Sequence, residues 1–139
     1  MSDFQAETNL NNQYTLVGKV LRIRWGKSYS DAHNHVAIGK AVHENANYLT
    51  MHCKTYHFGK KIGDIGGRKS RLVANEEISG IIEGEKLIRS VPWQRIEVIT
   101  ELPEDTDWDV PAEIDGTGLC QLLNKYKTMV SRSQDPQQM

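Results

Sequence analysis

The alternation of apolar and polar residues that begins near Tyr14 constrains the fold more than any other feature of the chain. In the stretch YTLVGKVLRIRW, residues 14–25, the apolar side chains of Val17, Leu21, Ile23 and Trp25 all fall on odd positions. Successive side chains of a β-strand point to opposite faces of its sheet, so this spacing places all four on one face. The folded part of the chain is therefore expected to begin with a half-buried strand.

Similar stretches recur up to residue 101, separated by residues that favour turns. They are HVAIGKAV (35–42), NYLTMHCKTYHF (47–58), the two halves of LVANEEISGIIEGEKLIRSV (72–91) and the segment that follows Pro92. Short strands joined by tight turns predict a small β-barrel, which removes exposed sheet edges by closing on itself. We therefore expect a mainly β fold, with a five-stranded SH3-like barrel over 14–101 and a flexible segment over 1–13.

The composition changes after residue 101. Seven carboxylates and no basic residue occupy positions 101–115, which predicts a solvated acidic linker over 102–116. The next stretch, TGLCQLLNKYKTMV, repeats apolar residues at helical spacing: Leu119, Leu122, Leu123, Tyr126 and Val130. This pattern predicts a C-terminal amphipathic α-helix over 117–131, followed by a polar tail over 132–139.

The bulk composition narrows the class of protein. The chain has 139 residues, of which 38% are hydrophobic and 25% charged, and its formal net charge is −1. A nucleic-acid-binding protein of this charge must gather its basic residues locally. The two cysteines do not make a disulfide framework, the N-terminus lacks the features of a signal peptide, and no apolar run could span a bilayer. A reduced, cytoplasmic protein is expected.

Two stretches carry a resemblance to a known family. GKAVHENANYLTM (39–51) and KLIRSVPWQRIEVI (86–99) are similar to the paired motifs of Sm-like (LSm) proteins. Members of that family are small barrels that assemble into rings and often bind RNA. The resemblance implies a homo-oligomeric ring, with single-stranded RNA as its partner at the pore.

The resemblance also assigns roles to individual residues. Asn47 falls at the motif's asparagine, and Ile88 and Arg89 match the second motif, whereas His43 and Ser90 stand where Asp and Gly are usual. By resemblance, Asn47 recognises a base and Arg89 lies next to it. His43 joins these RNA-binding candidates because it occupies the acidic position of the first motif.

The segment GKKIGDIGGRKSR (59–71) combines four glycines with five basic residues. It does not fit the phosphate-binding loop of nucleotide hydrolases, because that pattern needs Gly-Lys-Ser/Thr at the start of a helix. Four of its basic residues are candidates for contacts with RNA phosphates: Lys60, Lys61, Arg68 and Lys69. A solvated hairpin tip explains the same residues equally well.

The histidines and cysteines do not form a convincing metal or catalytic site. His52 and Cys53 are adjacent on an expected strand, so they point to opposite faces, and no paired-knuckle spacing accompanies them. His33 and His35 would share a face if extended, and whether they bind a metal or anion in an assembly stays open. No spacing indicates a nucleophile with its base, so we expect no catalytic residue, resident metal or cofactor, and no enzyme.

Two other classes of function compete with the RNA-binding ring. An SH3-like protein-interaction or assembly module without nucleic-acid binding would use the same strands and dock partners along an edge. A small metal- or ligand-dependent enzyme would retain stoichiometric metal after purification. Trp25, Trp93 and Trp108 fit either stacking on bases or packing inside the protein.

Overall fold

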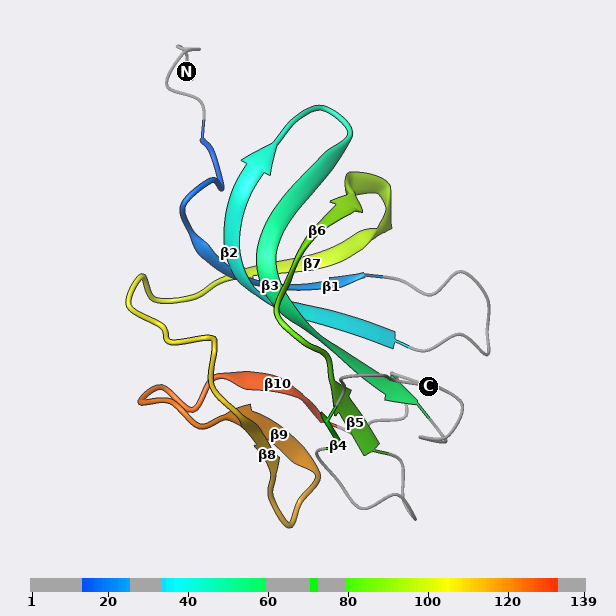
Figure 1. Ribbon diagram of the computed structural model, residues 1–139, viewed down its shortest axis with the longest axis vertical. Helices are drawn as coiled ribbons and strands as arrows, with labels where there is room; N and C mark the ends of the chain where they lie inside the picture. The colour runs from blue at the N-terminus through cyan, green and yellow to red at the C-terminus, as the bar shows by residue number, and fades with distance from the viewer. Residues whose placement is uncertain (1–13, 26–33, 60–70, 73–79, 133–139) are drawn as a thin grey trace.

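The computed structural model describes residues 14–25, 34–59, 71–72 and 80–132, and their fold is mainly β (Figure 1). The strands are β1 (Val20–Trp25), β2 (Asn34–Glu44), β3 (Tyr48–Gly59), β4 (Arg71–Leu72), β5 (Gly80–Glu83), β6 (Leu87–Pro92), β7 (Ile96–Glu101), β8 (Ala112–Ile114), β9 (Leu119–Leu122) and β10 (Met129–Arg132). A 3-10 turn, η2 (Trp93–Arg95), joins β6 to β7. The stretches predicted as strands within 14–25, 35–42 and 47–58 and after Pro92 therefore contain observed strands, whereas residues 73–79 of the stretch 72–91 lie outside the described residues.

Seven strands form the main sheet, in the order β4-β5-β3-β2-β1-β7, with β6 also paired to β3. The two longest strands, β2 and β3, run antiparallel through the middle of this sheet. Because β3 is 12 residues long, it has room for two further partners on its other side. β6 pairs with its first half, Tyr48 to Cys53, and β5 pairs with its second half, Tyr56 to Gly59.

The predicted closed, five-stranded barrel is wrong. β7 pairs with β1, and β6 pairs with β3. In the described part of the chain, no ladder joins β6 to β7, although η2 connects them directly. The turn sends β7 across to the far side of the sheet, so the sheet stays open along these two strands (Figure 1).

The predicted C-terminal helix over 117–131 is also wrong. This segment forms β9, a turn and β10, and β8 from the expected acidic linker completes a three-stranded sheet. The side-chain oxygen of Asn124 accepts hydrogen bonds from the backbone N–H groups of Tyr126 and Thr128, at 3.1 and 3.2 Å. Lys127 adopts a left-handed backbone with φ of 50°. These local bonds give the backbone an alternative to the helix.

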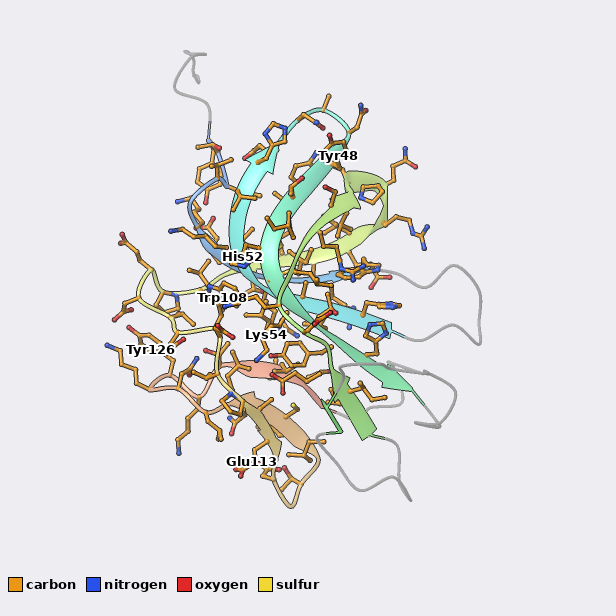
Figure 2. The ribbon with its side chains drawn as sticks, viewed as in Figure 1. Tyr48, His52, Lys54, Trp108, Glu113 and Tyr126 are labelled. Atoms are coloured by element: carbon orange, nitrogen blue, oxygen red, sulfur yellow. The ribbon has the colours of Figure 1, made fainter. Side chains whose placement is uncertain are left out.

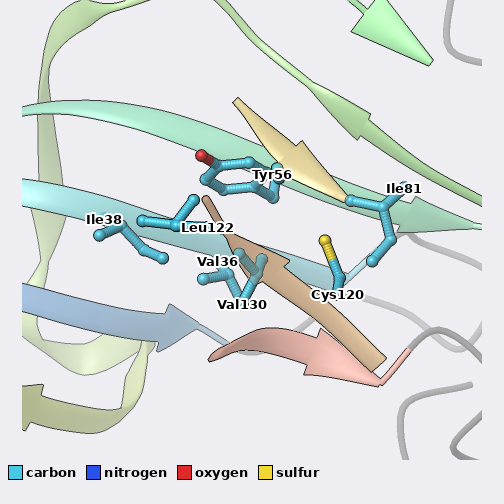
Figure 3. Packing of buried hydrophobic residues seen from close by; sticks show 8 residues of the cluster. Val36, Ile38, Tyr56, Ile81, Cys120, Leu122 and Val130 are labelled. Carbon is cyan, nitrogen blue, oxygen red and sulfur yellow. The ribbon is translucent and has the colours of Figure 1, made fainter. Parts of the chain in front are cut away.

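Apolar side chains are buried on both faces of the main sheet. The inner-face core lies on the concave side and comprises Leu21, Ile23, Ala37, Ala41, Leu49, Met51, Cys53 and Val91. The outer-face core lies beneath the three-stranded sheet and comprises Val36, Ile38, Tyr56, Ile81, Ala112, Cys120, Leu122 and Val130 (Figure 3). The alternation in β1 correctly predicted a shared buried face for Leu21 and Ile23, but it did not predict that the opposite face of the sheet would be buried as well.

β2 and β3 approach closely at Gly39, which is registered with Cys53. A Cβ atom at Gly39 would press on the backbone carbonyl of His52 and lie 2.6 Å from the Cβ of Cys53. Real Cβ atoms do not approach other atoms so closely. The pairing of the two long strands therefore requires glycine at this position.

Residues 102–111, here called the strap, connect β7 to β8 and cross the outer side of the main sheet. Lys54 of β3 forms a buried ion pair with Glu83 of β5, and its ammonium donates a hydrogen bond to the carbonyl of Val110 at 3.1 Å. The His52 ring packs edge-on against Trp108, with centroids 5.3 Å apart (Figure 2). The strap is thus fixed to the sheet by both charge and stacking.

Among the described residues, no helix has the length and apolar character needed to cross a membrane.

Candidate functional site

Asn47 lies in the turn between β2 and β3, and the backbone of this turn is held in place by hydrogen bonds. The side-chain oxygen of Asn45 accepts from the N–H groups of Asn47 and Tyr48 at 2.8 and 2.9 Å. Trp93 in η2 donates its backbone N–H to the carbonyl of Asn47 and its indole N–H to that of Asn45. The Asn47 side chain is exposed on this fixed turn.

His43 lies near the same turn, at the end of β2, and its side chain is exposed. Its ring is 6.3 Å from that of Tyr48, in a tilted arrangement. The adjacent Glu44 accepts hydrogen bonds from the Leu16 N–H and the Thr15 hydroxyl. These bonds lower the pKa of Glu44, the backbone bond from Leu16 contributing most. The turn region therefore has an ordered backbone and an accessible surface.

The structure separates Arg89 from Asn47. Arg89 is registered with Met51 on the inner face of the sheet, and Met51 lies four residues after Asn47 in the chain. At the rise of a β-strand, four residues span roughly 13 Å. The pair of residues that the resemblance places side by side is therefore not brought together within this chain.

Arg89 instead lines a cleft of about 180 Å³ at the open side of the sheet, together with Trp25, Ser90, Val91, Pro92 and Arg95. Arg89 is half-buried, and its Nε atom is buried with no hydrogen-bond partner among the described residues. Arg95 ends η2, and Trp25 ends β1 opposite Ile96. The cleft thus combines two guanidinium groups with an indole ring.

Trp25 begins a row of aromatic rings across the inner face. Its ring stacks on that of His35, with centroids 5.1 Å apart and planes 11° from parallel. His35 in turn meets His57 edge-on at 4.3 Å. The strand registers pair Trp25 with His35 and His35 with His57, which explains the row. Packing against the histidine holds the indole in a fixed orientation beside the cleft.

Sequence reasoning considered Trp25 for stacking but assigned no role to Arg95, and it did not associate His57 with His35. The signal for Arg95 is its position after Pro92-Trp93, where a short turn returns the chain toward β1. The rings of Trp25, His35 and His57 meet because of the register in which their strands pair. The residue pattern of a single strand contains no information on that register.

Five further residues named from the sequence lie outside the described residues: Lys60, Lys61, Arg68, Lys69 and His33.

The edges of β6 and β7 form a second candidate surface. On the inner face, Leu87 of β6 and Ile99 of β7 are exposed beside the buried Cys53 and Ile23, their partners in the adjacent strands. On the outer face, Ile88 is 69% exposed, and Val98 of β7 is also exposed. Each open edge therefore presents an apolar side chain on both faces, next to backbone groups of an edge strand.

His52 and Cys53 point to opposite faces of β3, as their adjacent positions predict. His52 packs against Trp108 on the outer face, whereas Cys53 belongs to the inner-face core. Burial raises the pKa of the Cys53 thiol to about 11, although the charge of Arg89 opposes this shift. The thiol is therefore protonated at neutral pH and is a poor nucleophile. No group of three or more potential metal ligands occurs in the part of the chain that the structure describes.

Comparisons with known proteins found no matching family model, no similar curated protein and no similar solved structure.

Proposed function

We propose that the protein is the subunit of a homo-oligomeric, Sm-like ring that binds single-stranded RNA, with β6 of one copy pairing to β7 of the next. The observation that supports this most directly is the pair of open, apolar sheet edges. The two edges belong to the same sheet but lie on different sides of its opening. One copy can therefore pair its β6 with β7 of a second copy and its own β7 with β6 of a third. Such a head-to-tail contact forms a ring when the rotation between subunits closes.

The physical argument for pairing rests on the edges themselves. An edge strand presents unpaired N–H and C=O groups, and proteins commonly protect such edges with charges, prolines or covering segments. On these edges the exposed polar residues Ser90, Glu97 and Thr100 accompany four exposed apolar side chains: Leu87, Ile88, Val98 and Ile99. Pairing β6 with β7 would satisfy the backbone groups of both strands and remove these side chains from water.

The RNA-binding part of the proposal is supported by local charge, because the chain as a whole carries a formal net charge of −1. Arg89 and Arg95 line one cleft at the open side of the sheet. The acidic strap lies across the outer side, where Asp109 pairs with Lys86 at 2.7 Å. The Asp109 carboxylate is therefore held by a lysine and is not among the residues that line the cleft with the arginines, which limits its repulsion of RNA.

The mass of the protein in solution tests the assembly. Size exclusion with light scattering at micromolar concentration should give a discrete multimer for the unmodified chain. Ile88→Glu with Val98→Glu should give monomers, because charges on an edge oppose strand pairing. Leu123→Glu is the matched control, since Leu123 is 52% exposed but lies in the turn between β9 and β10. A strictly monomeric unmodified protein would overturn the ring.

A second candidate function uses the same edges. If the protein is monomeric and does not bind RNA, the open β6 edge favours an interaction module that accepts an extended strand from a different protein. The mass measurement and an RNA titration together separate this module from the ring.

A further inference from the structure

We infer that the cleft between β6, η2 and the end of β1 binds one nucleotide of the RNA strand, with Arg89 and Arg95 on its phosphate and Trp25 on its base. This inference rests on the proposed RNA-binding function and gives it a site. It differs from the site implied by the sequence resemblance, because Asn47 is not part of the cleft.

The charge of the cleft is suited to a phosphate. Two of the six described residues that line the cleft are arginines, and none of these six is acidic. A guanidinium group offers several N–H donors in a planar arrangement that matches phosphate oxygens. The Nε–H of Arg89 is buried and has no hydrogen-bond partner within the described residues. This buried atom is out of reach of a ligand in the cleft, so a phosphate would be bound by the terminal nitrogens of the two guanidinium groups.

The aromatic part of the cleft is suited to a base. His35 packs flat against Trp25, with planes 11° from parallel, so the indole is already oriented before a ligand binds. A preorganised ring reduces the entropy lost on binding. Stacking on an indole does not require a particular base, so the site would hold single strands with little sequence preference.

The size of the cleft indicates how much of a strand it can take. Its volume of about 180 Å³ is below the ~300–1,000 Å³ typical of pockets that enclose a drug-sized ligand. A site of this size accommodates part of an extended strand rather than a folded RNA. Pro92 and η2 form its rigid wall, since η2 is bonded to the β2–β3 turn through Trp93.

Fluorescence anisotropy with a labelled short uridine oligomer, at low and moderate salt, tests the site. Arg95→Gln should weaken binding about tenfold. It should also reduce the slope of log affinity against log salt concentration by about one, as expected for the loss of one phosphate contact. Trp25→Leu should weaken binding about 5- to 150-fold, the range for loss of one stacked base, whereas Trp25→Phe should retain most of the affinity. Lys40→Gln is the charge-matched control, because Lys40 is exposed and lies on β2 away from the cleft.

The outcomes distinguish this inference from the function on which it rests. If the unmodified protein binds no RNA, both fail. If it binds RNA but Arg95→Gln and Trp25→Leu bind as tightly as Lys40→Gln, only the cleft is wrong. Circular dichroism confirms that each variant is folded, and Arg95→Gln keeps the test valid if Trp25→Leu does not fold.

A competition arm identifies the ligand chemistry. Uridine monophosphate should displace the oligomer from the unmodified protein and do so less well from Trp25→Leu. Inorganic phosphate at the same concentration should displace it poorly, because it lacks a ring. Equal displacement by phosphate and by the nucleotide would show a simple anion site and overturn the assignment.

Discussion

The two faces of the main sheet are completed in different ways. The outer face is covered by the chain itself, through the strap and the three-stranded sheet that follows it. The inner face is enclosed by the curvature of the sheet, but it stays open where β6 and β7 do not meet. Within the described residues, 102–132 thus complete one face and do not cover the opening of the other.

The contacts on the outer face explain why it is closed. The guanidinium of Arg22 donates a hydrogen bond to the carbonyl of Val130 at 3.1 Å, which joins the two sheets. At the far end of the strap, Asp105 accepts hydrogen bonds from Tyr126 and Lys125 in the β9–β10 turn. Comparable polar contacts do not join β6 to β7 in the described residues. This difference is the reason that we propose an interaction site on the inner side and its edges.

The strongest test of this comparison is to break the buried ion pair of the outer face. The side chains of Lys54 and Glu83 are only 11% and 5% exposed. Lys54→Met would take the ammonium away from the buried Glu83 carboxylate, and we expect a loss of about 3–5 kcal/mol in the free energy of unfolding. Urea denaturation measures this loss.

The double variant Lys54→Met with Glu83→Leu provides the control. Replacing both charges with apolar groups of similar volume is commonly neutral or stabilising, so most of the lost stability should return. If the double variant is as unstable as Lys54→Met, then the hydrogen bond from Lys54 to Val110, rather than the ion pair, fixes the strap.

The second test compares the two cores. Leu122 on the outer side and Leu49 on the inner side are both completely buried. Truncating either to alanine should cost about 2–5 kcal/mol, because each leaves a cavity. Urea unfolding of both variants checks this. A much smaller cost for Leu122→Ala would mean that the three-stranded sheet contributes little to the stability of the main sheet.

The sequence predicted the inner face of the sheet better than the outer face. Leu21 and Ile23 alternate with polar residues, and the structure buries them on one face as expected. The same logic could not predict the burial of Tyr56 on the opposite face of β3, since its cover comes from a segment some 60 residues later. That segment was assigned to a helix.

The incorrect helix has a specific cause. Leu119, Leu122 and Leu123 fit a helical stripe, but in the structure Cys120 and Leu122 are buried, and Leu123 is exposed. The turn chemistry carried the missed signal, because Asp115-Gly116-Thr117-Gly118 precedes β9 and Asn124 organises the turn that follows it. Asp and Gly favour such hairpin turns.

The candidate site was only partly predictable for a related reason. Arg89 and Trp25 were recognised as residues of interest, but their neighbours depend on how strands pair. Arg89 faces Arg95 and Trp25 only because η2 turns the chain back toward β1. Motif resemblance, which placed Arg89 with Asn47, contains no information on this bend.

The third test asks how tightly the inner face is packed despite its open edges. Gly39→Ala would push a Cβ against the backbone of His52 and the Cβ of Cys53. Since backbone atoms cannot move aside easily, we expect a loss of about 1–3 kcal/mol, typical of overpacking. Thermal unfolding measures it, with Gly116→Ala as the control, because nothing lies within 4 Å of a Cβ built at Gly116. Equal effects would mean that β2 and β3 separate readily at this point.

The smallest expected effect comes from the charges that fix the strap at the surface. The hydrogen bond from Lys86 is the main cause that lowers the pKa of Asp109, and the charges of Lys54 and His52 add to it. A lowered pKa means that the folded protein favours the carboxylate. The stability from Asp109 is therefore fully present above its ordinary pKa of 3.8, and it is lost as the pH falls through the lower value of the folded state.

Asp109 is 45% exposed, so solvent screening limits the effect. Asp109→Asn should cost about 0.5 kcal/mol near neutral pH, and this difference should disappear as the pH falls below the lowered pKa of Asp109, or in about 1 M salt. Urea unfolding of both proteins at each condition measures it, with Glu113→Gln on the exposed side of β8 as the control. A penalty that does not change with pH or salt would contradict the electrostatic account. The outer face would then be closed by the packing of Trp108 on His52 and by the hydrogen bond to Val110, with surface charge playing no part.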